Sequence, residues 1–221
     1  MRRLALLLAL LSLVLSGSPR TSARAADRAG DFDYYVLALS WNAAWCAAAG
    51  DARGAAQCAP GGGIGFILHG LWPQYENGWP EYCETTQPDP SRAETAAMAD
   101  IMGSGGLAWH GWKKHGRCSG LAPAAYFALA RLAWEAVVRP ESLRRIAKPL
   151  RLAPRVIEQA FIDSNPDLTP GLKPDGVTVT CRDRMIREVR ICLTKNLAPR
   201  LCTGATARDC AVSDPLFPPM R

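Results

Sequence analysis

Hydrophobic residues near the start of the chain follow the pattern of buried β-strands. Residues 32–41 combine aromatic and β-branched side chains in a nearly continuous apolar run, which predicts a core strand. After a Gly-rich stretch, residues 64–69 form a second apolar run, which predicts a buried strand ending at His69. The Ala- and Gly-rich residues 42–63 between them favour a short helix or a loop.

The middle of the chain changes to helical spacing. In residues 123–138 apolar side chains recur three and four positions apart and Pro140 follows, which predicts a helix that ends there. Shorter helices are expected over residues 93–102, 142–147 and 155–164. Residues 74–92 carry Gly, Pro, Asn and aromatic side chains, and we expect a long functional loop.

Alternation of apolar and polar residues returns in the last third of the chain. Residues 177–181 and 186–194 alternate strongly and are separated by a short polar turn, which predicts a β-hairpin. No internal repeat, low-complexity tract or long linker divides the chain after its N-terminal segment. The order of the elements therefore favours one α+β domain over residues 26–221.

The N-terminal segment has the composition of an export signal. Arg2 and Arg3 precede a short apolar run, and Ala23-Arg24-Ala25 supplies the small residues of a cleavage site. A retained membrane anchor is the less favoured alternative, because the run is short for a membrane span. We therefore expect residues 1–25 to be a signal peptide and the mature chain to be periplasmic or extracellular, without membrane attachment.

Export changes the meaning of the net charge. The chain carries 26 Lys and Arg against 20 Asp and Glu, but four of the arginines and none of the acids lie in residues 1–25. The mature chain then has 22 basic and 20 acidic residues, so its net charge is +2 rather than +6. Overall charge therefore gives little support for a nucleic-acid partner, and any anion-binding site has to be local.

The cysteine content indicates disulfides rather than a metal site. An even number of cysteines in an exported chain is most simply a set of disulfides, here four. No pair has the Cys-x-x-Cys spacing of a zinc finger, and spacing alone does not assign partners. The eight cysteines are Cys46, Cys58, Cys83, Cys118, Cys181, Cys192, Cys202 and Cys210.

The three histidines of the chain lie in two short segments. His69 precedes Gly-Leu-Trp-Pro, and His110 and His115 flank Lys114 in residues 109–118. Two imidazoles that titrate near neutral pH can act as base and acid in one reaction, and a lysine can stabilise a developing anion. If residues 109–116 are helical, Gly116 is expected to stop the helix, with His115 about 140° around from His110.

These two segments resemble the active-site segments of the ribonuclease T2 family. The resemblance rests on Phe-Ile-Leu-His69-Gly-Leu-Trp-Pro and on His110-x-Trp-x-Lys114-His115-Gly-x-Cys, and it extends over most of the mature chain. It implies one disulfide-bonded domain with a central antiparallel sheet flanked by helices. It also implies an endoribonuclease that acts on single-stranded RNA without a metal or cofactor; we expect a monomer.

The resemblance further implies a role for each site residue. His115 takes the proton from the ribose 2′-OH and His69 protonates the departing 5′ oxygen, which gives a 2′,3′-cyclic phosphate that is later hydrolysed to a 3′-phosphate. Because the 2′-OH is an internal nucleophile, an acid, a base and an anion clamp are sufficient. The positions that match the phosphate clamp are His110 and Lys114, and the expected base contacts are Trp72, Gln74 and Tyr75.

The chain departs from the family pattern at Gly111, where the family usually has an acid or amide, most often Glu. Glycine supplies no carboxylate, so we expect reduced but not abolished activity, because the two principal acid–base residues remain. For the cysteines, the resemblance implies the pairs Cys83–Cys118, Cys181–Cys210, Cys192–Cys202 and Cys46–Cys58. The first would hold the loop after His69 against the segment that carries His115.

Two other functions remain open from the sequence. Three histidines with an open position could hold a zinc ion that activates water, although an i,i+5 histidine pair converges poorly and Lys114 lies between the ligands. A protein that binds RNA without cleaving it is the second alternative, and Gly111 motivates it. Sensitivity to chelators would distinguish the first, and RNA that shifts in a gel but stays intact would identify the second.

Overall fold

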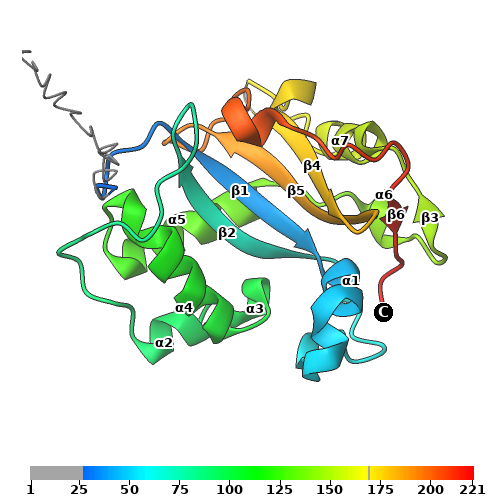
Figure 1. The fold of residues 1–221 in the computed structure, drawn as a ribbon, viewed down its shortest axis with the longest axis horizontal. Helices are drawn as coiled ribbons and strands as arrows, with labels where there is room; N and C mark the ends of the chain where they lie inside the picture. Colours follow the sequence, from blue (N-terminus) through cyan, green and yellow to red (C-terminus); the bar gives the residue numbers. More distant parts are fainter. Residues whose placement is uncertain (1–26, 169) are drawn as a thin grey trace, which may run out of the picture.

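A computed structural model describes residues 27–168 and 170–221 of the chain, and in it six strands form one sheet. Figure 1 shows that the sheet lies at the centre of the fold. The expected signal peptide, residues 1–25, lies outside the described residues. The strands are β1 (Tyr34–Trp41), β2 (Phe66–Gln74), β3 (Leu150–Arg151), β4 (Val177–Arg182), β5 (Met185–Leu193) and β6 (Leu216–Phe217).

The centre of this sheet is antiparallel, as expected. Strand β1 pairs antiparallel with β2 on one side and with β5 on the other, and β4 completes the predicted hairpin with β5. Only the short strand β6 makes the sheet mixed, because it meets β5 in parallel where Met185 lies opposite Leu216. The α+β fold with a central antiparallel sheet is thus confirmed.

The helices gather in two groups beside the sheet (Figure 1). Helices α2 to α5 lie near β2, whereas α6 and α7 lie on the side of β4. No helix in the described ranges is long and apolar enough to cross a membrane. The helices are α1 (Asn42–Trp45), α2 (Arg92–Ala96), α3 (Ala99–Met102), α4 (Gly105–Lys114), α5 (Pro123–Ala136), α6 (Glu141–Arg144) and α7 (Pro154–Asp163).

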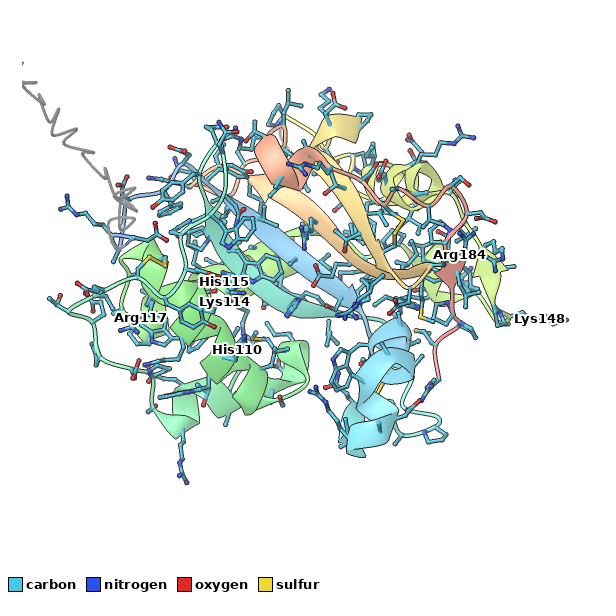
Figure 2. The ribbon with its side chains drawn as sticks, viewed as in Figure 1. His110, Lys114, His115, Arg117, Lys148 and Arg184 are labelled. Atoms are coloured by element: carbon cyan, nitrogen blue, oxygen red, sulfur yellow. A yellow bond between two sulfur atoms is a disulfide. The ribbon has the colours of Figure 1, made fainter. Side chains whose placement is uncertain are left out.

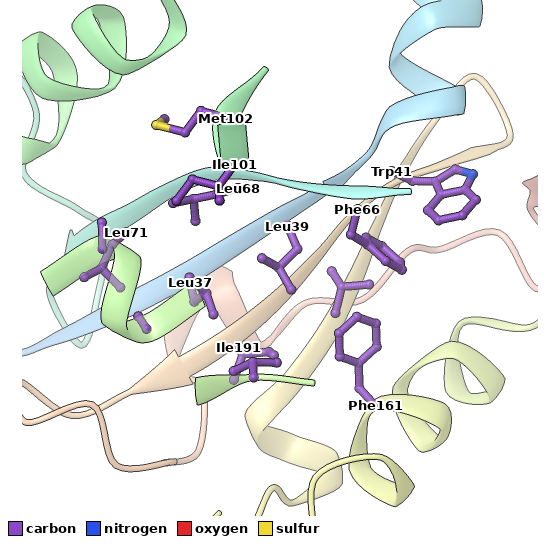
Figure 3. Close-up of a cluster of buried hydrophobic side chains, with 14 of the residues drawn as sticks. Leu37, Leu39, Trp41, Phe66, Leu68, Leu71, Ile101, Met102, Phe161 and Ile191 are labelled. Atoms are coloured by element: carbon purple, nitrogen blue, oxygen red, sulfur yellow. The ribbon is translucent and has the colours of Figure 1, made fainter. Parts of the chain in front are cut away.

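Alternation along β1 divides the sheet into a core face and a second face. Leu37, Leu39 and Trp41 belong to the main hydrophobic core, where Figure 3 shows them beside Phe66 and Phe161. The intervening residues, such as Val36 and Ala38, belong to a separate small cluster with Cys192 and Cys202. Successive side chains of a strand point to opposite faces of the sheet. The core face packs under the helices, and the second face borders the cavity of the candidate active site.

Two expectations about the histidine segments are wrong. Strand β2 does not end at His69 but continues to Gln74, because pairing with β1 resumes after a bulge. Helix α4 ends at Lys114, so His115 has non-helical dihedrals, and Gly116 opens a 3₁₀ turn instead of stopping the helix. A Cβ on Gly116 would lie 2.7 Å from the Tyr126 ring, so this glycine is required by close packing.

All eight cysteines are paired, and the pairs are those that the family resemblance implies. They are Cys46–Cys58, Cys83–Cys118, Cys181–Cys210 and Cys192–Cys202. The second pair connects the loop after β2 to the turn after α4, and the amide of Tyr82 also donates to the carbonyl of Lys114 at 2.9 Å. This loop is therefore held covalently and by backbone hydrogen bonding against the end of α4.

Candidate active site

A β-bulge in β2 places His69 on the second face of the sheet. In the pairing with β1, Ala38 lies opposite Gly70 and Leu39 opposite Leu68, which leaves His69 as the extra residue. A bulge redirects a side chain and is common next to active sites. Gly70 is required beside it, because a Cβ there would clash with the indole of Trp72.

Helix α4 brings the second histidine segment to the same place. Ser104 caps the helix by accepting from the amide of Leu107 at 3.2 Å, and the helix ends where the amide of His115 donates to the carbonyl of Gly111 at 2.9 Å. Figure 2 shows His110, Lys114 and His115 together along α4, next to strand β2.

The two segments meet at one cavity of about 310 Å³. The sheet, α4, the loop after β2 and the C-terminal segment all contribute to its lining. The lining residues are Val36, His69, Trp72, Gln74, Trp79, Leu107, His110, Gly111, Lys114, His115, Arg190, Ala205 and Thr206. All three histidines of the chain therefore face one cavity.

His115 is half-buried and lines the cavity. Its ring stacks on the indole of Trp72, with centroids 4.9 Å apart, and its Nδ1 is buried without a hydrogen-bond partner among the described protein atoms. Burial, followed by the positive charges of Lys114, His69 and His110, lowers the pKa of His115 to about 3. The imidazole is therefore neutral over most of the pH range, which is the form that accepts a proton.

His69 lies in a different electrostatic environment. Its Nδ1 makes a short hydrogen bond to Oε1 of Glu188, a residue of β5 that is only 6% exposed. Burial alone would raise the pKa of Glu188, but the hydrogen bond and charge of His69 and the pairing with Arg190 lower it to about 2. An ionised carboxylate only accepts, so Nδ1 of His69 carries the proton in this contact, and Nε2 is the nitrogen left for a substrate.

The two neighbouring lysines at the end of α4 have different environments. Lys114 lines the cavity, and its ammonium lies 3.5 Å from the carboxylate of Glu81. Lys113 is not among the lining residues and donates to Asp89 at 3.0 Å. Of these two cations, Lys114 is thus the one available to an anion in the cavity.

The expected base contacts are only partly brought together. Trp72 and Gln74 line the cavity, although Gln74 is buried and its amide donates to the carbonyl of Pro73 at 2.8 Å. Tyr75 is not among the lining residues; it packs against the main core, and its hydroxyl lies 3.4 Å from Asp27. Trp79, in contrast, lines the cavity and is 44% exposed.

Several residues that line the cavity or contact its histidines were not identified as site residues from the sequence. Glu188 and Arg190 are two positions apart on β5. A charged pair at this spacing is also common on the solvent-facing side of a strand, so the sequence does not mark it as part of a site. Thr206 and Ala205 come from the C-terminal segment, which has no motif. Trp79 carries the clearest signal, because an aromatic residue in a Gly- and Pro-rich loop is a typical stacking residue.

The arrangement does not favour the zinc alternative. Within residues 27–168 and 170–221, no three His, Cys, Asp or Glu side chains converge as metal ligands would. His69 is already bound to Glu188, and His115 stacks on Trp72.

Comparison with known proteins identifies the family of this chain. Residues 32–202 match the ribonuclease T2 family. A ribonuclease of Aeromonas hydrophila is 34% identical over 186 residues, which cover 84% of this chain and 83% of that protein. The chain therefore belongs to the ribonuclease T2 family, whose members include this bacterial ribonuclease.

Solved structures support the same fold. The self-incompatibility-associated SF11-RNase of Nicotiana alata superposes with a TM-score of 0.63 at 20% identity, covering 85% of this chain and all of that one. RNase NT, solved in complex with 5′-AMP, superposes with a TM-score of 0.59 at 24% identity and covers 86% and 100% of the two chains. At this identity, the likeness defines the fold alone.

Proposed function

We propose that this protein is an endoribonuclease that cleaves single-stranded RNA by attack of the ribose 2′-OH on the adjacent phosphate. The 5′ oxygen leaves, a 2′,3′-cyclic phosphate forms, and water later opens it to a 3′-phosphate. The observation that carries the proposal is that His69 and His115 reach one cavity in opposite electrostatic environments. Such a separation is the usual way to assign acid and base.

In this mechanism His115 is the general base. Its neutral imidazole accepts the proton of the 2′-OH, and Trp72 shields it from water. His69 is the general acid, because Glu188 stabilises its protonated form and leaves Nε2 to protonate the departing 5′ oxygen. In the second step, the two histidines exchange roles as water attacks the cyclic phosphate.

His110 and Lys114 are proposed to hold the phosphate. Both line the cavity from α4, one helical turn apart on the same side. A cation held here stabilises the charge that develops on the pentacovalent phosphorus. Trp72 and Gln74 are proposed base contacts, and Trp79 adds an exposed ring on which a base can stack. RNase NT, whose structure contains 5′-AMP, supports a nucleotide ligand for this fold.

The proposal extends to the setting of the reaction. The basic start, short apolar run and cleavage site of residues 1–25 support export to the periplasm or the exterior. Four disulfides in the described residues fit an oxidising compartment.

The test is cleavage of a single-stranded RNA by the oxidised mature protein in the presence of EDTA. We expect cleavage with 2′,3′-cyclic phosphate ends, and loss of activity by at least roughly 10²-fold in His115→Ala and in His69→Ala. Loss of cleavage in EDTA, restored by zinc, would instead support a metal site.

A second candidate function, RNA binding without cleavage, is favoured by Gly111. This residue lines the cavity at the position where the family usually carries an acid, and it supplies no functional group. In that case the protein retards RNA in a gel and leaves it intact, at acidic and neutral pH alike.

A further inference from the structure

The only carboxylate that contacts a cavity histidine in the described residues comes from the sheet, not from α4. Glu188 lies on β5, which is separated from the strand of His69 by β1. The β1 residues that pair between them, Ala38 and Ser40, have short side chains, so His69 and Glu188 can meet across the strand.

Glu188 is itself fixed in place. It is 6% exposed, and its second oxygen, Oε2, accepts from Nε and from a terminal nitrogen of Arg190 at 3.2 and 3.0 Å. The guanidinium of Arg190 lies 5.5 Å from the centre of the Trp72 ring. Oε2 of Glu188 therefore accepts from Arg190 and Oε1 accepts from His69, so the carboxylate has little freedom to rotate.

We propose that Glu188 is a positioning residue for His69, which it holds in the tautomer and orientation of a general acid. The inference rests on the proposed function. It also means that a carboxylate still takes part in the proposed acid–base chemistry, although Gly111 supplies none. This carboxylate is Glu188 on β5, and it contacts His69 rather than His115. An acid that orients an imidazole through Nδ1 and stabilises the imidazolium is a known arrangement in enzymes.

The surroundings of His69 contain few other charges. Arg190 lies on β5 beside Glu188, and His110, Lys114 and His115 face the cavity from α4 and the residue after it. All of these are cations or bases, so each opposes protonation of His69 when it is charged. Among the described residues, Glu188 is the only carboxylate that contacts His69, so its removal leaves His69 facing cations and bases alone.

The test is Glu188→Gln, which keeps the size and an acceptor oxygen but removes the charge. A general acid acts only in its protonated form, so the alkaline limb of kcat/KM reports it. Without the carboxylate, we expect that limb to move down by about 1 pH unit. The limb at acidic pH, which reports the base, should stay in place.

Glu158→Gln is the matched control. Glu158 is also a buried glutamate, 8% exposed, but it lies on α7 and does not line the cavity. Glu158→Gln should leave both limbs at the parent's pH. Glu188→Asp keeps the charge and should retain the alkaline limb of the parent even if the rate falls. This second variant keeps the inference testable if Glu188→Gln does not fold.

A readout without activity separates this inference from the proposed function. The chain has three histidines, so the spectrum of a protein with ¹⁵N-labelled histidine contains three imidazoles. In Glu188→Gln the ¹⁵N and ¹H signals of the His69 ring should lose the features of an Nδ1–H bound to a carboxylate, whether or not RNA is cleaved. Unchanged ring signals of His69, or a slower enzyme with an unmoved alkaline limb, would overturn the positioning role.

Discussion

The indole of Trp72 stacks on the imidazole of His115, with ring centroids 4.9 Å apart and planes inclined by 26°. The same indole lies edge-on to His69 at 5.0 Å. Trp72 therefore contacts both histidines of the proposed acid–base pair and limits the access of water to His115. This gives Trp72 a role in the electrostatics of the base besides the expected stacking on a nucleobase.

Removal of the Trp72 ring should change the pH profile. Burial is the largest cause of the low pKa of His115, so Trp72→Ala should raise that pKa from about 3 towards its ordinary value. Because the base must be neutral, the acidic limb of kcat/KM should then move to higher pH by about 1 unit or more. Trp109→Ala, which removes a 42% exposed ring outside the cavity, should not move it. An unmoved limb in Trp72→Ala would contradict the shielding role.

The same burial should make the protein less stable in acid. Folded His115 has a pKa of about 3 against an ordinary 6.5, so its neutral burial contributes fully above pH 6.5 and is lost as the pH falls towards 3. Glu188, whose pKa is also lowered, adds its own loss only below about pH 4.5. We therefore expect the free energy of unfolding to fall by roughly 1 kcal/mol per pH unit between pH 6.5 and 4.5.

His115→Gln isolates this contribution. The variant has no group that titrates at this site, so its unfolding free energy should depend less on pH in that window. Denaturant titrations at several pH values measure the two slopes. Equal slopes in parent and variant would show that His115 is not the buried neutral group described here.

Restoring the carboxylate at Gly111 should raise the rate. A Cβ at Gly111 would meet only the Cε of Met102, at 3.7 Å, so the position accepts a side chain that enters the cavity. Gly111→Glu should increase kcat by about 10-fold, because an added acid–base or orienting group contributes on this scale or more. Gly111→Ala is the control, since it stabilises the helix by roughly 1 kcal/mol without adding a functional group. If the Glu variant is no faster than the Ala variant, the missing acid does not limit the rate.

The disulfide Cys83–Cys118 should matter more for activity than for the fold. It joins the loop after β2 to the turn that follows His115, and both cysteines are almost fully buried. The double variant Cys83→Ser/Cys118→Ser should keep the circular-dichroism spectrum of the parent, lose roughly 2–5 kcal/mol of stability and lose at least about 10-fold in kcat/KM.

The control for this disulfide is Cys46→Ser/Cys58→Ser. This pair closes a local loop after β1 and contributes no residue to the cavity. Its removal should cost stability but leave kcat/KM within about 2-fold of the parent at a temperature where both are folded. A comparable loss of kcat/KM in the two double variants would argue against a specific role for Cys83–Cys118.

Sequence patterns were sufficient for the elements with strong periodicity. The strand ending at Trp41, the helix from Pro123 and the hairpin of β4 and β5 were all predicted within a few residues. The end of β2 was not, because a histidine followed by glycine is typical of a strand end, whereas here Gly70 makes room for Trp72 and pairing continues. Close packing between side chains two residues apart leaves no periodic signal.

The site residues that lie in short sequence motifs could be predicted, whereas those that only the fold brings together could not. His69, His110, Lys114 and His115 are recognisable from their spacing, and they face one cavity. Glu188 is distant in sequence and lies two strands away from His69, so only the register of β1 with its two neighbours brings it there. Tyr75 directly follows the cavity-lining Gln74 in the sequence but packs against the main core instead.

The most direct test of the account uses a DNA oligonucleotide with a single ribonucleotide. If the 2′-OH is the nucleophile and the two histidines are its acid and base, the oxidised mature protein in EDTA cuts only on the 3′ side of that ribonucleotide. The 5′ fragment then ends in a 2′,3′-cyclic phosphate, and His115→Ala leaves the strand intact. Cleavage at deoxyribonucleotides, or products with 5′-phosphate ends, would contradict the mechanism.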